Sequence, residues 1–285
     1  MEWFEAILLG LVQGLTEFLP VSSSGHLEIG KVLLGVETKD DLLFTTMVHA
    51  ATVLSTIVVF RSQIWDLLKG FFCGLKDWKI ARRPEGGRYL VCNDQTDYLL
   101  KIAVSMIPIF VVGVFLKDFV ESLFGSIYVV GFALMVTACL LFFSDMASRP
   151  GKKSIFPAND YRNGLSYWQA LAVGIGQAFA VVPGLSRSGT TISTGLICGV
   201  KRDVMAQFSF LMVLVPILGE AVLEIAGGGF GESSVGALPL VLGFISAFFS
   251  GLFACKVMIA LVKKAKLRWF ALYCLIAAVL IFIFS

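Results

Sequence analysis

Charged residues are scarce in this chain. Only 15% of its 285 residues are Asp, Glu, Lys or Arg, whereas a typical soluble domain carries roughly 25%. Hydrophobic residues make up 57% of the chain, and the mean hydropathy is +0.86. This composition excludes an ordinary soluble domain and predicts a chain that lies mostly in lipid. The net charge of +3 is too small to indicate a nucleic-acid partner.

Several patterns that would indicate other functions are also missing. The six cysteines form no CxxC pair, so neither a metal centre nor a disulfide framework is predicted. Acidic Glu2 and Glu5 stand where a secretory signal peptide has a basic segment, so we expect no cleaved leader. There is no GxxxxGK[ST] phosphate loop. A channel would need a ring of acids or a carbonyl filter motif, and the sequence has neither.

Long apolar runs are abundant. A spanning helix needs about 20 mainly apolar residues. Six stretches meet this requirement: 42–60, 99–116, 127–143, 204–224, 236–256 and 268–284. Two more apolar stretches, 1–29 and 167–198, are interrupted by polar segments with Pro and Gly at 20–26 and 183–191. Non-helical backbone at membrane depth must be buried in protein or line a wet cavity, so both stretches are predicted to be re-entrant helical hairpins.

The positive charges predict the side of the membrane on which each connection lies. The segments rich in Lys and Arg are 61–98, 144–166, 199–203 and 257–268. By contrast, 225–235 contains neither residue and 117–126 contains one Lys. The positive-inside rule places the first group in the cytoplasm and the other two segments outside. The sides alternate consistently only if the first hairpin enters from outside, the second enters from inside, and both termini lie outside.

Each half of the chain is then one interrupted hairpin followed by three spans, in opposite orientations. Residues 13–26 read QGLTEFLPVSSSGH and residues 177–190 read QAFAVVPGLSRSGT. Both segments open with Gln, and both carry Ser-X-Ser-Gly before a closing polar residue. We therefore predict an all-α polytopic membrane protein with an inverted-topology repeat and a site where the broken segments meet. Residues 1–285 would form one membrane domain, with repeats at about 1–143 and 167–285.

Ionisable groups within membrane segments are costly and usually functional. The first hairpin contains Gln13 and Glu17, which share a helix face because they are four residues apart. A carboxylate in such a cleft can act as a general base or bind a hard cation. The alternatives are a buried structural hydrogen bond and a helix-terminal acid.

The run Ser22-Ser23-Ser24-Gly25-His26 places hydroxyl groups beside an imidazole. Histidine is an acid or base near neutral pH, so it could activate a serine, itself attack phosphorus, or activate a water. The serines could instead satisfy backbone groups at the helix break. The sequence leaves these alternatives open.

The second break has the features of a phosphate cradle. Its glycines permit close approach of a ligand, and the N–H groups that begin the next helix favour an anion. Arg187 adds a planar, permanently charged fork that fits phosphate oxygens. The accompanying candidates are Ser186, Ser188, Gly189, Thr190 and Thr191. The alternative is a structural turn in which Arg187 pairs with Glu17.

Weaker candidates lie elsewhere. His49 is mid-span among alanines and threonines, where we expect a packed, hydrogen-bonded residue. Glu220 and Glu224 are interpreted as an interfacial acid pair or a cation contact. Segment 61–98 is interpreted as a solvated cytoplasmic loop, with a short amphipathic helix around 64–75 as the alternative.

Together the two motifs resemble those of the bacterial undecaprenyl-diphosphate phosphatase family, and the resemblance covers essentially the whole chain. The first family motif, [E/Q]xxxE followed by PvSSxGH, is matched by Gln13, Glu17, Pro20, Ser22, Ser23, Gly25 and His26. The second, PGxSRSGxT, is matched by Pro183, Gly184, Ser186, Arg187, Ser188, Gly189 and Thr191. The chain departs from the common pattern at Gln13, which leaves one carboxylate fewer, and at His49 and Ala51, where the family often has Gln and Gly.

This resemblance implies a multi-pass enzyme of the bacterial plasma membrane that hydrolyses undecaprenyl diphosphate to the monophosphate. The reaction would recycle the carrier lipid for peptidoglycan synthesis and link the protein to bacitracin resistance. A divalent cation, Mg²⁺ or Ca²⁺, is implied, as is a site open to the periplasmic side. The expected partners are the lipid substrate and the bilayer, with a second copy of the chain as the candidate protein partner.

We predict roles for these residues in such a reaction. The expected catalytic residues are Glu17, Ser23, His26 and Arg187, with Glu17 and Gln13 holding the cation. The expected substrate-binding residues are Gln13, Ser22, Ser24, Gly25, Ser186, Ser188, Gly189, Thr190 and Thr191. A transporter or flippase for a phosphate-bearing isoprenoid lipid is the alternative, because broken helices in an inverted repeat suggest alternating access. A carrier needs no nucleophile beside a general base, so the combination of Glu17, His26 and Arg187 favours the enzyme.

Overall fold

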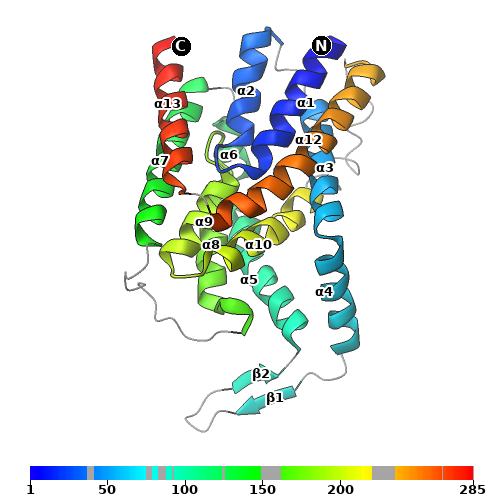
Figure 1. Cartoon of the computed structure of the whole chain (residues 1–285), viewed down its shortest axis with the longest axis vertical. Coiled ribbons are helices and arrows are strands. Elements are labelled where there is room, and N and C mark those ends of the chain that lie inside the picture. Colours follow the sequence, from blue (N-terminus) through cyan, green and yellow to red (C-terminus); the bar gives the residue numbers. More distant parts are fainter. Residues whose placement is uncertain are drawn as a thin grey trace.

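The computed structural model describes residues 1–36, 42–74, 79–82, 88–91, 93–123, 126–148, 162–219, 235–264 and 266–284. Within these ranges the protein is a bundle of helices with one two-stranded hairpin (Figure 1). The prediction of a helical membrane fold is confirmed. The weaker candidates Glu220 and Glu224 lie outside the described residues.

Both interrupted stretches form two helices separated by a break. Helices α1 (Trp3–Phe18) and α2 (Ser23–Leu34) form the first unit, and α8 (Tyr167–Phe179) and α9 (Arg187–Ile197) form the second. The longest of these helices has 16 residues, fewer than the about 20 that a span requires. The predicted helix–break–helix form is therefore confirmed, with the breaks at 19–22 and 180–186.

Helices also occur where the six spans were predicted. They are α3 (Leu42–Val59), α5 (Asp94–Phe115), α7 (Ile127–Ala147), α10 (Arg202–Met212), α12 (Ala237–Lys264) and α13 (Arg268–Phe284). In the described part of the chain, four helical stretches are long and apolar enough to cross a membrane: Asp94–Phe115, Ile127–Ala147, Arg202–Gly219 and Ala237–Val262. The pair formed by α3 and α4 (Arg61–Gly74), bent by 75°, would make a fifth. The chain is thus a multi-pass membrane protein.

The interpretation of 61–98 as a solvated loop was wrong. This segment contains α4, the antiparallel strands β1 (Lys79–Arg82) and β2 (Arg88–Val91), and the start of α5. Apolar side chains on α4 are exposed, among them Trp65 and Phe72. The amphipathic-helix alternative was therefore correct, although the helix begins three residues earlier than predicted. Short elements complete the fold: α6 (Lys117–Ser122) and the 3-10 turn η3 (Arg162–Gly164).

The first helix of each hairpin packs against a long helix from the other half of the chain. Helix α1 lies along α12, and α8 lies along α5. A Cβ atom added at Gly14 of α1 would lie 2.5 Å from the Ala247 carbonyl oxygen, and one at Gly174 of α8 would lie 2.8 Å from Ser105 Cα. Because glycine has no side chain, the two helices of each pair can cross closely at these positions. An inverted repeat would produce this reciprocal packing, but the repeat and its bounds stay predictions.

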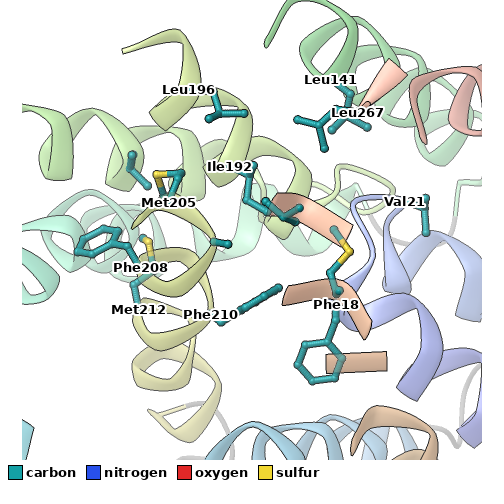
Figure 2. Close-up of a cluster of buried hydrophobic side chains, with 14 of the residues drawn as sticks. Phe18, Val21, Leu141, Ile192, Leu196, Met205, Phe208, Phe210, Met212 and Leu267 are labelled. Carbon is teal, nitrogen blue, oxygen red and sulfur yellow. The ribbon is translucent and has the colours of Figure 1, made fainter. Parts of the chain in front are cut away.

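A hydrophobic core holds the ends of the two hairpins together. Phe18, the last residue of α1, lies near Phe210 of α10 and Ile192 of α9 (Figure 2). The Phe18 and Phe210 rings meet edge to face with centroids 5.9 Å apart. Because Glu17 directly precedes Phe18, this packing also determines where that carboxylate points.

The two ends of the molecule differ. The N- and C-termini lie at one end, and strands β1 and β2 lie at the other (Figure 1). This arrangement agrees with the prediction that the termini share one side of the membrane and that the basic segment 61–98 lies on the other.

Candidate active site between the helical breaks

The two breaks contact each other through reciprocal hydrogen bonds. The Ser24 hydroxyl of the first hairpin accepts a hydrogen bond from the Gly184 amide at 3.4 Å. The Ser188 hydroxyl of the second hairpin donates to the Leu19 carbonyl at 3.1 Å. Gly184 has φ +89°, and a Cβ there would lie 2.7 Å from the Val130 backbone, so the position requires glycine. The two predicted motifs, which are far apart in sequence, thus form one site.

Each break ends in a serine that caps the following helix. Ser22 accepts a hydrogen bond from the Gly25 amide at 3.2 Å, and Ser186 accepts one from the Gly189 amide at 3.0 Å. These bonds satisfy amides that a helix start leaves unpaired. Ser22 has φ +71°, a strained conformation that is uncommon outside glycine. For Ser22, the alternative in which serines satisfy backbone groups describes the structure, and Ser186 makes the equivalent cap in the second break.

Glu17 lies at the centre of the first motif. Its Oε2 atom accepts hydrogen bonds from Ser23 Oγ at 2.6 Å and from Gln13 Nε2 at 2.7 Å. The Glu17 side chain is only 8% exposed, so these bonds compensate part of the cost of burying a carboxylate. A hydroxyl at this distance from a carboxylate has the geometry of a nucleophile with its general base.

His26 is held by both ring nitrogens. Its Nδ1 lies 2.7 Å from the Ser22 carbonyl oxygen, which can only accept, so Nδ1 carries the proton. In the neutral ring, Nε2 then accepts a hydrogen bond from the Tyr273 hydroxyl at 2.7 Å. The His26 and Tyr273 rings also stack, with centroids 5.5 Å apart.

The role of Tyr273 was missed in the sequence. It belongs to α13, the last apolar helix, far from either motif. The only signal was a phenol group in an otherwise apolar span.

Arg187 and Glu17 face a shared cavity with a volume of about 20 Å³. It is lined by Glu17, Phe18, Thr52, Val53, Thr56, Arg187, Ser188, Thr191, Ser209, Phe210, Val213, Leu214 and Ile217. This volume holds about one water molecule. The Arg187 backbone carbonyl accepts a hydrogen bond from Thr191 Oγ1 at 2.9 Å. The Arg187 side chain interacts electrostatically with the Glu17 carboxylate, but in the described part of the chain it makes no hydrogen bond or direct ion pair, so the predicted alternative of a directly bonded Glu17–Arg187 pair is not formed. Its guanidinium remains available for an anion.

Several buried polar atoms near the breaks lack a partner in the described part of the chain. They include Gln13 Oε1 and Thr190 Oγ1. Thr191, by contrast, shares a 2.6 Å hydrogen bond with Ser209, which the sequence analysis did not single out. Unsatisfied buried groups in a native site call for a ligand or water. The unpaired Gln13 Oε1 atom and the Glu17 carboxylate are both oxygen ligands of the kind that a hard cation prefers.

To bind such a cation tightly, the site would need additional ligand atoms from a substrate. Within the described ranges, no group of three or more His, Cys, Asp or Glu side chains surrounds a common point. Mg²⁺ typically takes one or two carboxylates and completes its shell with waters and substrate phosphates. Glu17 with Gln13 matches that partial set.

In this multi-pass membrane protein the site places a serine hydroxyl beside a buried carboxylate, next to a cavity that an arginine also lines. The family model for bacitracin resistance protein BacA matches residues 6–280, and the chain belongs to this family. The family resemblance inferred from the motifs is thereby confirmed.

Curated relatives match over nearly their full length. The chain is 50% identical over 281 residues to an undecaprenyl-diphosphatase of Parabacteroides distasonis, covering 97% of this chain and 96% of the relative. It is 48% identical over 289 residues to one of Bacteroides fragilis, covering 100% and 99%. It is 35% identical over 281 residues to one of Korarchaeum cryptofilum, covering 99% and 98%.

Proposed function

We propose that this protein hydrolyses undecaprenyl diphosphate to undecaprenyl phosphate and inorganic phosphate, which recycles the carrier lipid for peptidoglycan synthesis. The observation that carries the proposal is the 2.6 Å hydrogen bond from Ser23 to Glu17, beside a cavity that Arg187 also lines. A carrier would need the arginine but not the serine–carboxylate pair. Relatives of the same length are named for hydrolysis, which also favours the enzyme over the transporter.

In this mechanism the site first binds the terminal phosphate. The Arg187 guanidinium and the amides at the start of α9 hold phosphate oxygens. Ser23 Oγ then attacks the terminal phosphorus while Glu17 takes the hydroxyl proton. The bridging P–O bond breaks, and undecaprenyl phosphate leaves. Water next attacks the phosphoserine, inorganic phosphate departs, and Ser23 regains a proton.

His26 is the alternative nucleophile. Its Nε2 would have to release the Tyr273 hydroxyl before attacking, whereas Ser23 already donates to a base. We therefore assign His26 to orienting the first break through the Ser22 carbonyl. Acid quenching during turnover separates the two alternatives, because a phosphoserine survives acid and a phosphohistidine does not.

A divalent cation, Mg²⁺ or Ca²⁺, would be held by Glu17 and Gln13, and when bound it supplies positive charge that offsets the charge of the diphosphate. The isoprenoid tail lies among the membrane helices. The positive-inside rule favours a cytoplasmic position for 61–98 and an outside position for both termini. The family resemblance implies the plasma membrane and a site that opens to the periplasmic side. A second copy of the chain is the expected protein partner.

The test is phosphate release from an isoprenoid diphosphate by purified protein in detergent, with and without Mg²⁺. We expect release by wild type and its collapse in Ser23→Ala and Arg187→Ala. Ser126→Ala is the matched control, because this serine precedes α7 without a side-chain cap bond. No release by folded wild type under any metal condition would reject the proposal and make lipid transport the better hypothesis.

A further inference from the structure

His49 of α3 points one ring nitrogen at the carboxylate of the site. Its Nε2 atom lies 3.9 Å from Glu17 Oε2, and its side chain is 17% exposed. We expected a packed, hydrogen-bonded histidine, and one of its two ring nitrogens does make a hydrogen bond. Nδ1 lies 2.8 Å from the Thr45 carbonyl oxygen.

The Thr45 contact determines the tautomer. A carbonyl oxygen only accepts, so Nδ1 carries the proton, and the lone pair of the neutral ring is on Nε2. Metal-binding histidines commonly have this arrangement, with one N–H donated to a backbone carbonyl and the other nitrogen free to coordinate. His49 is therefore oriented with its coordinating nitrogen toward Glu17.

The separation between Glu17 and His49 fits a shared ion. Two atoms that each lie about 2.1 Å from one cation are about 3.0 Å apart at a right angle and about 4.2 Å apart when opposite. The 3.9 Å between Glu17 and His49 falls in this interval. Gln13 hydrogen-bonds the same carboxylate through Nε2, and its buried Oε1 has no partner in the described chain. The three side chains come from α1 and α3, which pack together.

We infer that His49 is a ligand of the cation at this site, so that Gln13 Oε1, the Glu17 carboxylate and His49 Nε2 form a mixed nitrogen–oxygen set. The inference rests on the proposed function only for the presence of a cation. An imidazole ligand favours first-row transition metals over Ca²⁺ and Mg²⁺. The site should therefore bind Mn²⁺ more tightly than Mg²⁺.

The test uses Mn²⁺ as the probe and reads its ligands directly. The chain contains only two histidines, so a protein carrying a histidine-free affinity tag has two possible imidazole sources. We expect Mn²⁺ electron spin-echo spectra of wild type to show imidazole nitrogen coupling. The coupling should persist in His26→Ala and disappear in His49→Gln, which retains a polar side chain of similar size. A matching thermal melt would show that His49→Gln is folded.

Three outcomes would overturn the inference: bound Mn²⁺ without nitrogen coupling in wild type, coupling that survives in His49→Gln, or coupling that depends on His26. The first of these would leave His49 as an ion-pair partner of Glu17. Phosphate release is measured separately on the same wild-type protein. Hydrolysis without nitrogen coupling would refute only the role of His49, and nitrogen coupling without hydrolysis would refute only the proposed function.

Discussion

Removal of the Tyr273 hydroxyl tests how the two distant parts of the site cooperate. Tyr273→Phe deletes the 2.7 Å hydrogen bond to His26 Nε2 but keeps the ring that stacks on the imidazole. Tyr273 is 47% exposed, so water can replace the lost donor, and the bond is worth about 0.5–1.5 kcal/mol. If the lost bond is one that orients the site in the transition state, kcat/KM should fall roughly 2- to 13-fold, at about 1.4 kcal/mol for each factor of ten.

The assay is steady-state phosphate release by wild type, Tyr273→Phe, His26→Ala and the double variant. Tyr273 has no other hydrogen-bond partner in the described chain, so its hydroxyl should act through His26 alone. The Tyr273→Phe loss should then vanish in the His26→Ala background. Tyr128→Phe is the matched control, because that half-exposed ring on α7 stacks on Phe282 and its hydroxyl makes no hydrogen bond to His26 in the described chain. An equal loss in both backgrounds, or no loss in wild type, would refute the reasoning.

Three other changes have expected outcomes. Arg187→Lys should lower kcat/KM by about 10- to 100-fold, because a point charge cannot make the paired hydrogen bonds of a guanidinium; full activity would show that the fork is not used. Gly14→Ala should lower the thermal midpoint, since overpacking costs about 1–3 kcal/mol and the new Cβ would lie 2.5 Å from the Ala247 carbonyl oxygen. Gly113→Ala, with nothing within 4 Å of its Cβ, should not lower the midpoint, and equal melting of the two variants would contradict the packing argument. Removal of divalent cations with EDTA should abolish phosphate release, and added Mg²⁺ or Mn²⁺ should restore it; metal-independent release would exclude the cation role of Glu17.

Much of the fold could be predicted because its signals are local. An apolar run of about 20 residues marks a span wherever it occurs, and the polar segments at 20–26 and 183–191 mark breaks because they cannot continue a helix in lipid. The segment 61–98 was misread since α4 mixes charged and apolar side chains, which resembles a solvated loop more than a helix. The serine caps at Ser22 and Ser186 follow from the same local rules.

The sequence by itself determined that this chain resides in a membrane, where its helices break, and which polar residues lie at the breaks. Periodicity assigns a residue to a helix face, but it does not say which distant helix that face will meet. Only the tertiary structure decided that Tyr273 bonds His26, 247 positions away, and that His49 of α3 faces Glu17 of α1. The physical reason is that such contacts depend on how close-packed helices cross, and those crossings depend on the fit of many side chains at once.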